Sequence, residues 1–225
     1  MRSEVRNPDN EPLNGERIAL VAVALADADG IEGLSMRKLA SELGTAPMSL
    51  YRHFANKEGL LDAMVDLVFG EMYPPGIGMD WKDELRKRGV SARETLRRHP
   101  WANGLMESRL HPGEASAAHH NATMGCLREA GFPFREAVHA YNLLDAYTYG
   151  FALQEMSIPF ETPEESGEVA AQTVGEKGAE FPYLAEVVVE LGKRGYDYTE
   201  EFEFGLDFIL EGLERLLASQ PTKAT

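Results

Sequence analysis

Residues 44–57 read GTAPMSLYRHFANK, and this short stretch decides the fold of the amino-terminal region. Thr45 is placed to cap a helix, and Pro47 suits the first turn of that helix, where a missing N–H costs little. At 100° per residue, Leu50 and Phe54 lie on one face, which we expect to be buried. The stretch therefore predicts a very short helix with one apolar face and an outward face of mixed chemistry.

Amphipathic helices are predicted on both sides of this stretch. Asn14, Ser35 and Asn56 are suited to cap three such helices, each of which ends at a residue or segment that stops a helix. Two short helices joined by a tight glycine-containing turn, and backed by a longer first helix, form a helix-turn-helix, whose second helix fits the major groove of DNA. Residues 14–72 therefore predict a DNA-binding domain.

The distribution of charge bears on this prediction. The 225-residue chain has 22 Lys and Arg against 37 Asp and Glu, and its net charge of −15 ordinarily argues against nucleic acid. Residues 35–57 are an exception, because they contain only one acid, Glu42, but four basic residues, Arg37, Lys38, Arg52 and Lys57. We expect this positive surface to face DNA, while the acids elsewhere lower non-specific binding.

The remainder of the chain is also predicted to be helical. Residues 73–80, YPPGIGMD, contain two prolines and two glycines and are expected to form a linker. Helices are expected over about 80–97, 100–109, 113–130, 133–156, 182–194 and 198–218, and the acidic segment 157–182 is expected to be a mobile, solvated loop. The chain is thus predicted to be all-α, with a flexible arm over 1–13, the helix-turn-helix domain over 14–72, a larger helical domain over 81–218 and a tail over 219–225.

Composition and motifs argue against several other classes of protein. The longest apolar run, Ile18–Ala26, is far shorter than the roughly 20 residues that a membrane span needs, so we expect a cytoplasmic protein. Cys126 is the only cysteine, which excludes an intramolecular disulfide and a cysteine-based zinc cluster. Glu136 and His139 supply only half of a di-metal bundle motif, and no phosphate loop or nucleophile elbow occurs. We expect neither an enzyme nor a cofactor or metal site.

Two segments, GLSMRKLASELG at 33–44 and SLYRHFANKEGLL at 49–61, resemble the DNA-binding domain of the tetracycline-repressor (TetR) family, over about residues 14–72. The resemblance implies phosphate contacts from Arg37, Thr45, Tyr51, His53 and Lys57, base contacts from Pro47, Met48 and Ser49, and either kind from Arg52. The chemistry agrees, because a hydroxyl or an ammonium binds phosphate without reading sequence, whereas methionine can contact a thymine methyl. The hydroxyl of Thr45 is available only if it does not cap the helix, and a packing role for His53 remains an alternative.

The carboxyl-terminal part resembles the ligand-binding domain of the tetracycline repressor itself, over about residues 80–218. REAGFPFREAVHAYNLLDAYTYGFALQE and FEFGLDFILEGLERLL carry this similarity, which implies a four-helix dimer interface. Gly205 and Gly212 lie one heptad apart in the last helix, where each glycine costs about 1 kcal/mol relative to alanine, so two of them suggest a close approach. The predicted interface comprises Gly205, Ile209, Gly212, Leu213 and Leu216, with a chance glycine pair in an ordinary core helix as the alternative.

An effector pocket is expected in the same domain, because apolar walls with a few polar groups suit a drug-sized molecule. The predicted lining is Trp101, Leu105, Met106, Asn121, Thr123, Met124, Tyr141, Asp145, Tyr149 and Gln154, with core packing as the alternative for each. Where the tetracycline repressor has a metal-chelating histidine and glutamate, this chain has Glu107 and Gln154, so we expect a metal-free, aromatic or polyketide-like ligand. The expected protein is a homodimeric repressor that this ligand releases from a palindromic DNA operator; the alternative is a helix-turn-helix protein without an effector.

Overall fold

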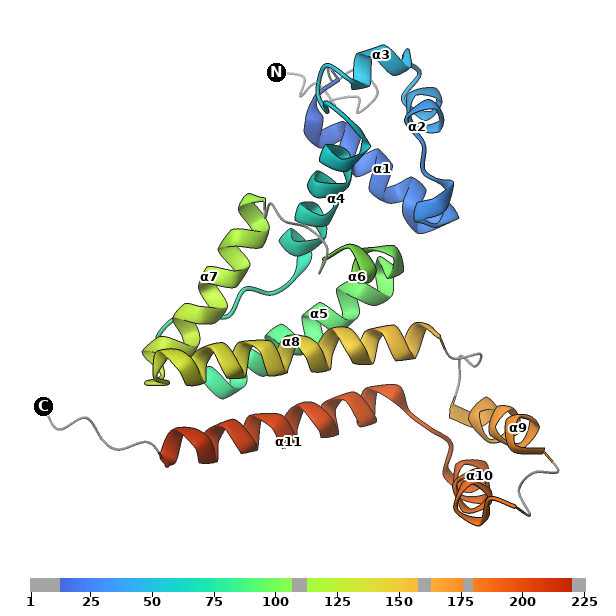
Figure 1. The fold of residues 1–225 in the computed structure, drawn as a ribbon, viewed down its shortest axis with the longest axis vertical. Helices are drawn as coiled ribbons and strands as arrows, with labels where there is room; N and C mark the ends of the chain where they lie inside the picture. Colours follow the sequence, from blue (N-terminus) through green and yellow to red (C-terminus); the bar gives the residue numbers. More distant parts are fainter. Residues whose placement is uncertain (1–12, 107–112, 158–162, 176–179, 220–225) are drawn as a thin grey trace, which may run out of the picture. The chain divides into compact units, whose positions relative to one another are not determined.

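The computed structural model describes residues 13–106, 113–157, 163–175 and 180–219 (Figure 1). Every regular element in these ranges is a helix, which confirms the all-α prediction. The order is α1 (Gly15–Asp29), the 3-10 turn η2 (Ile31–Gly33), α2 (Met36–Glu42), α3 (Pro47–Leu50), α4 (Lys57–Glu71), α5 (Trp81–Arg98), α6 (Pro100–Met106), α7 (Glu114–Glu129), α8 (Phe134–Met156), α9 (Pro163–Val174), α10 (Pro182–Arg194) and α11 (Tyr198–Ala218). No helix of the described chain is both long and apolar enough to cross a membrane. The predicted arm, except for its last residue, and the tail beyond Ser219 lie outside the described residues.

Internal contacts divide the chain into two compact units that do not follow the order of the sequence. The first unit contains residues 1–75 and 94–123, and the second contains residues 76–93 and 124–225. The helices α5 and α7 each contribute residues to both units. The linear domain limits given above therefore remain a prediction.

Side chains set the ends of the first helices. The N-caps of α1, α2 and α4 are Asn14, Ser35 and Asn56, whose side-chain oxygens accept hydrogen bonds of 2.8, 3.2 and 2.9 Å from the backbone N–H three residues later. These three predicted caps are confirmed. Gly30 follows α1 and Gly44 lies in the turn after α2, with φ angles of 75° and 62° that favour glycine.

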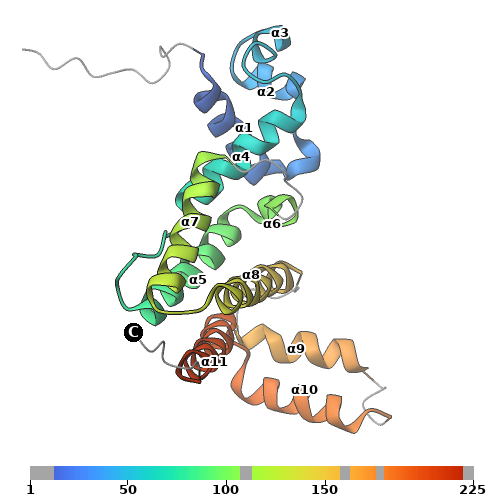
Figure 2. The same ribbon diagram turned by 60° about the vertical axis from the view of Figure 1, so that its left-hand side comes forward.

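The helices α8 and α11 lie side by side and carry the core of the second unit (Figures 1 and 2). Their shared apolar cluster includes the buried residues Leu144, Phe202, Leu206, Leu210 and Leu213. At Gly205 an added Cβ would collide with Tyr147, whose hydroxyl donates to the Phe202 carbonyl at 3.0 Å. The close approach predicted at Gly205 therefore occurs within one chain.

The loop predicted over 157–182 is wrong for Pro163–Val174, which forms the helix α9. This helix packs along α10, and the two lie side by side in both views (Figures 1 and 2). A Cβ added to Gly167 of α9 would lie 2.6 Å from the Cα of Gly192 in α10. Glycine destabilises an isolated helix, but here it permits the close packing of α9 against α10. This tertiary packing overrides the loop that the local composition predicts.

Arg88 of α5 is a charged residue inside the second unit. Its side chain is 1% exposed, and its Nη2 donates to Oδ1 of Asp145 in α8 at 2.5 Å. The guanidinium also lies over the ring of Tyr141, 5.8 Å from the ring centroid. Burial, together with the neighbouring Asp145 carboxylate, raises the pKa of Tyr141. Asp145 is therefore the counter-ion of a buried arginine.

We expect Asp145→Ala to lower the free energy of unfolding by about 3–5 kcal/mol, because the substitution leaves the Arg88 guanidinium buried without its counter-ion. Unfolding in urea, followed by circular dichroism, measures the loss. The control combines Arg88→Met with Asp145→Leu, which removes both charges at similar volume and should recover most of the stability. Equal destabilisation by the single and double variants would show that packing, not charge, decides the effect.

Candidate nucleic-acid interface

One fully buried leucine holds the predicted recognition segment. α3 has only four residues, too few for a stable isolated helix, and Leu50 at its end is 0% exposed. Leu39 of α2 is also fully buried, while Leu43 and Phe54 are half-buried. The apolar face predicted for α3 is therefore present, and it fixes a helix that local interactions cannot stabilise.

The N-cap of α3 is Ala46, so the cap predicted at Thr45 is wrong. Ala46 makes no side-chain capping hydrogen bond, and Pro47 follows it in the first turn, where proline has no N–H to satisfy. The backbone N–H of Thr45 instead donates to the Ala40 carbonyl at 2.9 Å and closes the turn after α2. The Thr45 hydroxyl is thus not used as the helix cap, which was the condition for its contact with phosphate.

The residues predicted to contact DNA all lie in the first unit, on α2, on α3, in the turns beside α3 and at the start of α4. Arg37, Pro47, Met48, Tyr51, Arg52 and His53 are exposed, whereas Thr45, Ser49 and Lys57 are half-buried. Met48 is 72% exposed, close in sequence to the fully buried Leu50. An apolar side chain with this exposure adds nothing to the core and is available for a contact outside the chain.

Two of the four basic residues near this surface have partners within the chain. Nζ of Lys38 pairs with Oδ2 of Asp29 at 2.6 Å, and Nζ of Lys57 donates to the Leu34 carbonyl at 2.9 Å. Lys57 therefore ties the start of α4 to the segment before α2, a structural role that its place in the motif does not indicate. Because an ammonium has three N–H donors, the bond to Leu34 is compatible with a phosphate contact.

Two family models match the chain. Residues 18–64 match the family described as bacterial regulatory proteins, tetR family, and residues 74–217 match the tetracyclin repressor-like C-terminal domain. The chain belongs to the TetR family. It is therefore a DNA-binding transcriptional regulator, and its TetR-family relatives are regulators rather than enzymes.

Similarity to individual proteins extends over both halves of the chain. The HTH-type transcriptional repressor DrrR1 of Streptomyces coeruleorubidus is 34% identical, over 96% of this chain and 83% of that protein. The tetracycline repressor protein class A from transposon 1721 in Escherichia coli is 29% identical, over 90% of this chain and 91% of that protein. The crystal structure of the TetR family protein ActR of Streptomyces coelicolor in complex with actinorhodin is 28% identical, with a TM-score of 0.76, and covers 92% of this chain and 99% of that one.

The residues predicted to line an effector pocket are divided between the two units. Trp101, Leu105, Met106, Asn121 and Thr123 belong to the first unit, and Met124, Tyr141, Asp145, Tyr149 and Gln154 belong to the second. Trp101 donates its indole N–H to Asp27 at 2.7 Å, and Thr123 donates its hydroxyl to the His119 carbonyl at 2.9 Å. Asn121 and Gln154 are exposed, and Glu107 lies outside the described residues. A common pocket for these residues remains a prediction.

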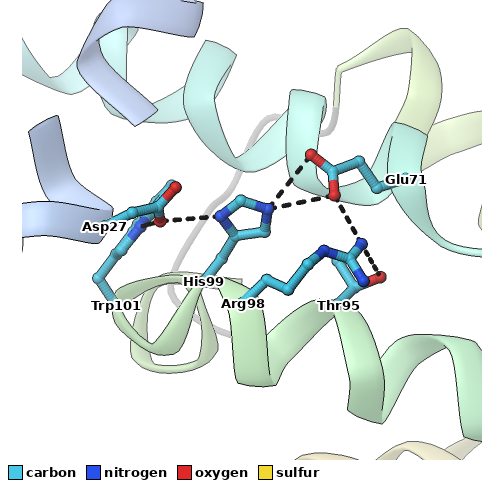
Figure 3. Close-up of polar contacts among 6 residues, drawn as sticks. All are labelled: Asp27, Glu71, Thr95, Arg98, His99 and Trp101. Carbon is cyan, nitrogen blue, oxygen red and sulfur yellow. Dashed lines mark hydrogen bonds and ion pairs between the residues drawn. The ribbon is translucent and has the colours of Figure 1, made fainter. Parts of the chain in front are cut away.

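A polar cluster that the sequence analysis missed lies in the first unit (Figure 3). His99, between α5 and α6, has its Nδ1 2.8 Å from Oδ1 of Asp27 in α1 and its Nε2 3.1 Å from Oε2 of Glu71 in α4. Trp101 donates to the same Asp27 oxygen, and Nη2 of Arg98 donates to Glu71 at 2.7 Å. No local motif reveals this cluster, because its members come from three distant parts of the sequence. The only signal in the sequence is that two of the predicted helices each have an acid near the C-terminal end, where basic residues are usual.

We expect Met48→Ala to lose discrimination at particular base pairs, by about 1–3 kcal/mol at each, because the lost side chain is predicted to contact the base edges. Tyr51→Phe removes a hydroxyl that is predicted to contact a DNA phosphate, so it should weaken binding to all sequences alike. Fluorescence anisotropy with variants of a selected DNA site measures both effects. A uniform loss for Met48→Ala would reverse these roles.

Lys57→Ala should reduce the dependence of binding on salt by about one phosphate's worth, because it removes an ammonium that is predicted to neutralise a phosphate. A neutral hydroxyl releases no counterion, so Tyr51→Phe should leave the salt dependence unchanged. Lys57→Ala also removes the hydrogen bond to the Leu34 carbonyl. An unchanged affinity of Tyr51→Phe at every salt concentration would exclude its hydroxyl from the phosphate contacts.

Proposed function

We propose that this chain is a repressor that binds a palindromic operator as a homodimer and is released by a small aromatic molecule without a metal ion. The observation that carries the proposal is the exposed surface around α3, joined in one chain to a C-terminal domain of the tetracycline-repressor type. The relatives support the direction of regulation, because DrrR1 and the class A protein are both repressors by name.

An apolar face on α8 and α11 supports the homodimer. Phe204 and Phe208 lie one turn apart on α11 and are 71% and 68% exposed, and Leu143 and Leu153 of the adjacent α8 are also exposed. Large apolar side chains that are exposed on two neighbouring helices favour burial against another protein surface. At Gly212, one turn after Phe208, an added Cβ would meet no atom of the described residues beyond its own helix within 4 Å. This face therefore has room for the close approach of a second copy.

The proposed face differs from the interface predicted from sequence. Leu213 is 4% exposed within its own chain, and Gly205 accommodates Tyr147. Ile209 and Leu216 pack partly against the same internal core. Of the predicted residues, Gly212 fits the exposed face best, so we place the centre of the interface along Phe204, Phe208 and Gly212.

A two-fold dimer explains the palindromic operator in this proposal. The same surface of each copy would contact the partner, so the two α3 segments would be related by the two-fold axis. Recognition helices in such a dimer enter successive major grooves about 34–36 Å apart. Sequencing the DNA that the protein selects from a genomic pool tests this: two inverted half-sites one helical turn apart are expected.

The proposed effector is planar and aromatic or polyketide-like. The proposal is supported by structures of ActR, a TetR family protein similar to this chain over 92% of its length, in complex with actinorhodin and with (S)-DNPA. A metal-free ligand is proposed because Gln154 is a neutral amide at the position where the resemblance to the tetracycline repressor implies a chelating carboxylate. The ligand must bind the released form more tightly than the DNA-bound form, because equal affinity for both shifts nothing.

A helix-turn-helix protein without an effector is the second candidate function. Under this second candidate function, DNA binding responds to no small molecule. The protein would either coat DNA generally or remain on one site. Footprinting on a genomic fragment separates the two, because the proposed repressor protects one short palindrome and leaves it when the effector is added.

We expect Gly212→Leu to weaken the dimer by about 1–3 kcal/mol, because the added side chain overpacks the proposed contact. DNA binding should weaken in parallel. Analytical ultracentrifugation at micromolar concentration measures the equilibrium, and Glu203→Leu, at an exposed position on another side of α11, is the matched control. A Gly212→Leu protein that dimerises like the wild type would place the interface elsewhere.

We expect planar aromatic compounds to release the selected operator equally well with magnesium and with a chelator. Release is measured as the loss of fluorescence anisotropy of labelled DNA across a panel of such compounds. Tyr149→Ala should raise the concentration needed for release, because an aromatic wall is lost from the proposed pocket. Release that requires magnesium would overturn the metal-free proposal.

A further inference from the structure

We propose that His99 is held as an imidazolium and positions α1 against α4, so that loss of its ring proton loosens the DNA-reading helices and weakens operator binding. The effect on the operator rests on the proposed function. The joint itself, in which His99 contacts both Asp27 of α1 and Glu71 of α4, does not depend on that function.

Both ring nitrogens of His99 face a carboxylate (Figure 3). Nδ1 lies 2.8 Å from Oδ1 of Asp27, and Nε2 lies 3.1 and 3.2 Å from the two carboxylate oxygens of Glu71. A neutral imidazole has one N–H and one lone pair, so it can donate to one carboxylate only and turns its lone pair toward the other. Only the imidazolium donates to both. Since His99 is 7% exposed, water has little access to compensate for a missing donor.

The ends of α1 and α4 need a positive charge at this place. Asp27 and Glu71 lie in the last turns of their helices, where the partial negative charge of the helix end adds to their own. Neither last turn contains a basic residue. The two helices pack against each other, and both acids contact the same imidazole ring. One cation between the carboxylates therefore stabilises both helix ends at once.

The other polar groups around the His99 ring do not remove the need for a positive charge between Asp27 and Glu71. Arg98 of α5 donates to Glu71 at 2.7 Å and to the Thr95 hydroxyl at 3.2 Å, and Trp101 of α6 donates to Asp27 at 2.7 Å. Partial burial opposes the ionisation of Glu71, but the hydrogen bonds and charges of Arg98 and His99 outweigh it and lower the pKa of Glu71. Glu71 therefore stays ionised near neutral pH. If His99 loses its proton, Arg98 is the only cation that remains beside two carboxylates in this cluster.

The direction of the pH dependence follows from these contacts. The joint is complete while both ring nitrogens carry a proton, so a rise in pH that removes one of these protons also removes one hydrogen bond to a carboxylate. On the acid side, the contribution of Glu71 is lost as pH falls through its lowered pKa. Helix α1 contacts α2, and Lys57 at the start of α4 binds the Leu34 carbonyl just before α2. The spacing of α1 and α4 therefore sets the position of the helix-turn-helix.

The first experiment needs no DNA. In protein labelled with ¹⁵N-histidine, with His99 assigned by the loss of its signals in His99→Gln, both ring nitrogens should have the shifts of an imidazolium at about pH 6. Unfolding of the wild type should also show a stability advantage over His99→Gln that shrinks as pH rises to about 8.5. Trp101→Phe, the control, removes a non-titrating donor to Asp27, so its loss of stability should not change with pH. A neutral His99 ring at the lower pH would overturn the proposal.

The second experiment measures operator affinity against pH. His53 is a second histidine, exposed beside α3, so the comparison is made between His53→Gln and the double variant His53→Gln with His99→Gln. The variant that keeps His99 should lose affinity about tenfold more between pH 6 and pH 8.5 than the double variant, as expected for a hydrogen bond to a charged group. Parallel pH profiles would overturn the link to operator binding. If no DNA site is bound selectively, the proposed function fails, whereas the NMR and unfolding measurements still decide whether His99 joins the helices.

Discussion

A helix of four residues cannot set its own orientation, and this constraint governs the DNA-binding surface. α3 has no side-chain cap, so its position depends on the buried Leu50 and on the turn that the Thr45 N–H closes onto Ala40. Lys57 adds a tie from α4 to the Leu34 carbonyl. Because these contacts use the inner face and the backbone, the outward side chains of α3 can differ without loss of the fold. The side chains predicted to read the DNA sequence and those that support the fold thus lie within a few residues of each other but on different faces.

The parts of the fold that could be predicted from sequence are those fixed by neighbouring residues. Asn14, Ser35 and Asn56 cap helices through atoms three residues away, so their role is visible in a linear pattern. The helix α9 could not be predicted, because its composition is typical of a flexible loop and its close packing at Gly167 against Gly192 of α10 is not visible in a linear pattern. The outward positions around α3 could likewise be predicted, since helical periodicity assigns their direction. The cluster around His99 could not, because it joins ends of helices that are adjacent only in the folded chain.

The acidic composition of the chain also has an internal use. Arg88 is buried against Asp145, and Arg93 forms two hydrogen bonds of 2.8 and 2.7 Å with Glu155. Burying an unpaired guanidinium would cost several kcal/mol, so these carboxylates are part of the core of the second unit rather than of its solvated surface. Each of these ion pairs contributes zero to the net charge of −15, so the excess of acids lies elsewhere in the chain. The balance that bears on DNA is the local one around α3, where residues 35–57 have four basic residues and one acid.

α4 is fixed at its start, middle and end to different parts of the first unit. Lys57 binds Leu34 at the start, Asp66 accepts the N–H of Ser116 in α7 at 2.8 Å, and Glu71 binds His99 at the end. A rigid helix held in this way transmits a displacement at one end to the other, because packed helices shift between discrete arrangements rather than deform continuously. Under the proposed function, an effector that shifts α6 or α7 must therefore either carry α4 with it or break these bonds. The free energy for either outcome comes only from the difference in ligand affinity between the two arrangements, so the strength of the contacts at Asp66 and Glu71 sets how large that difference has to be.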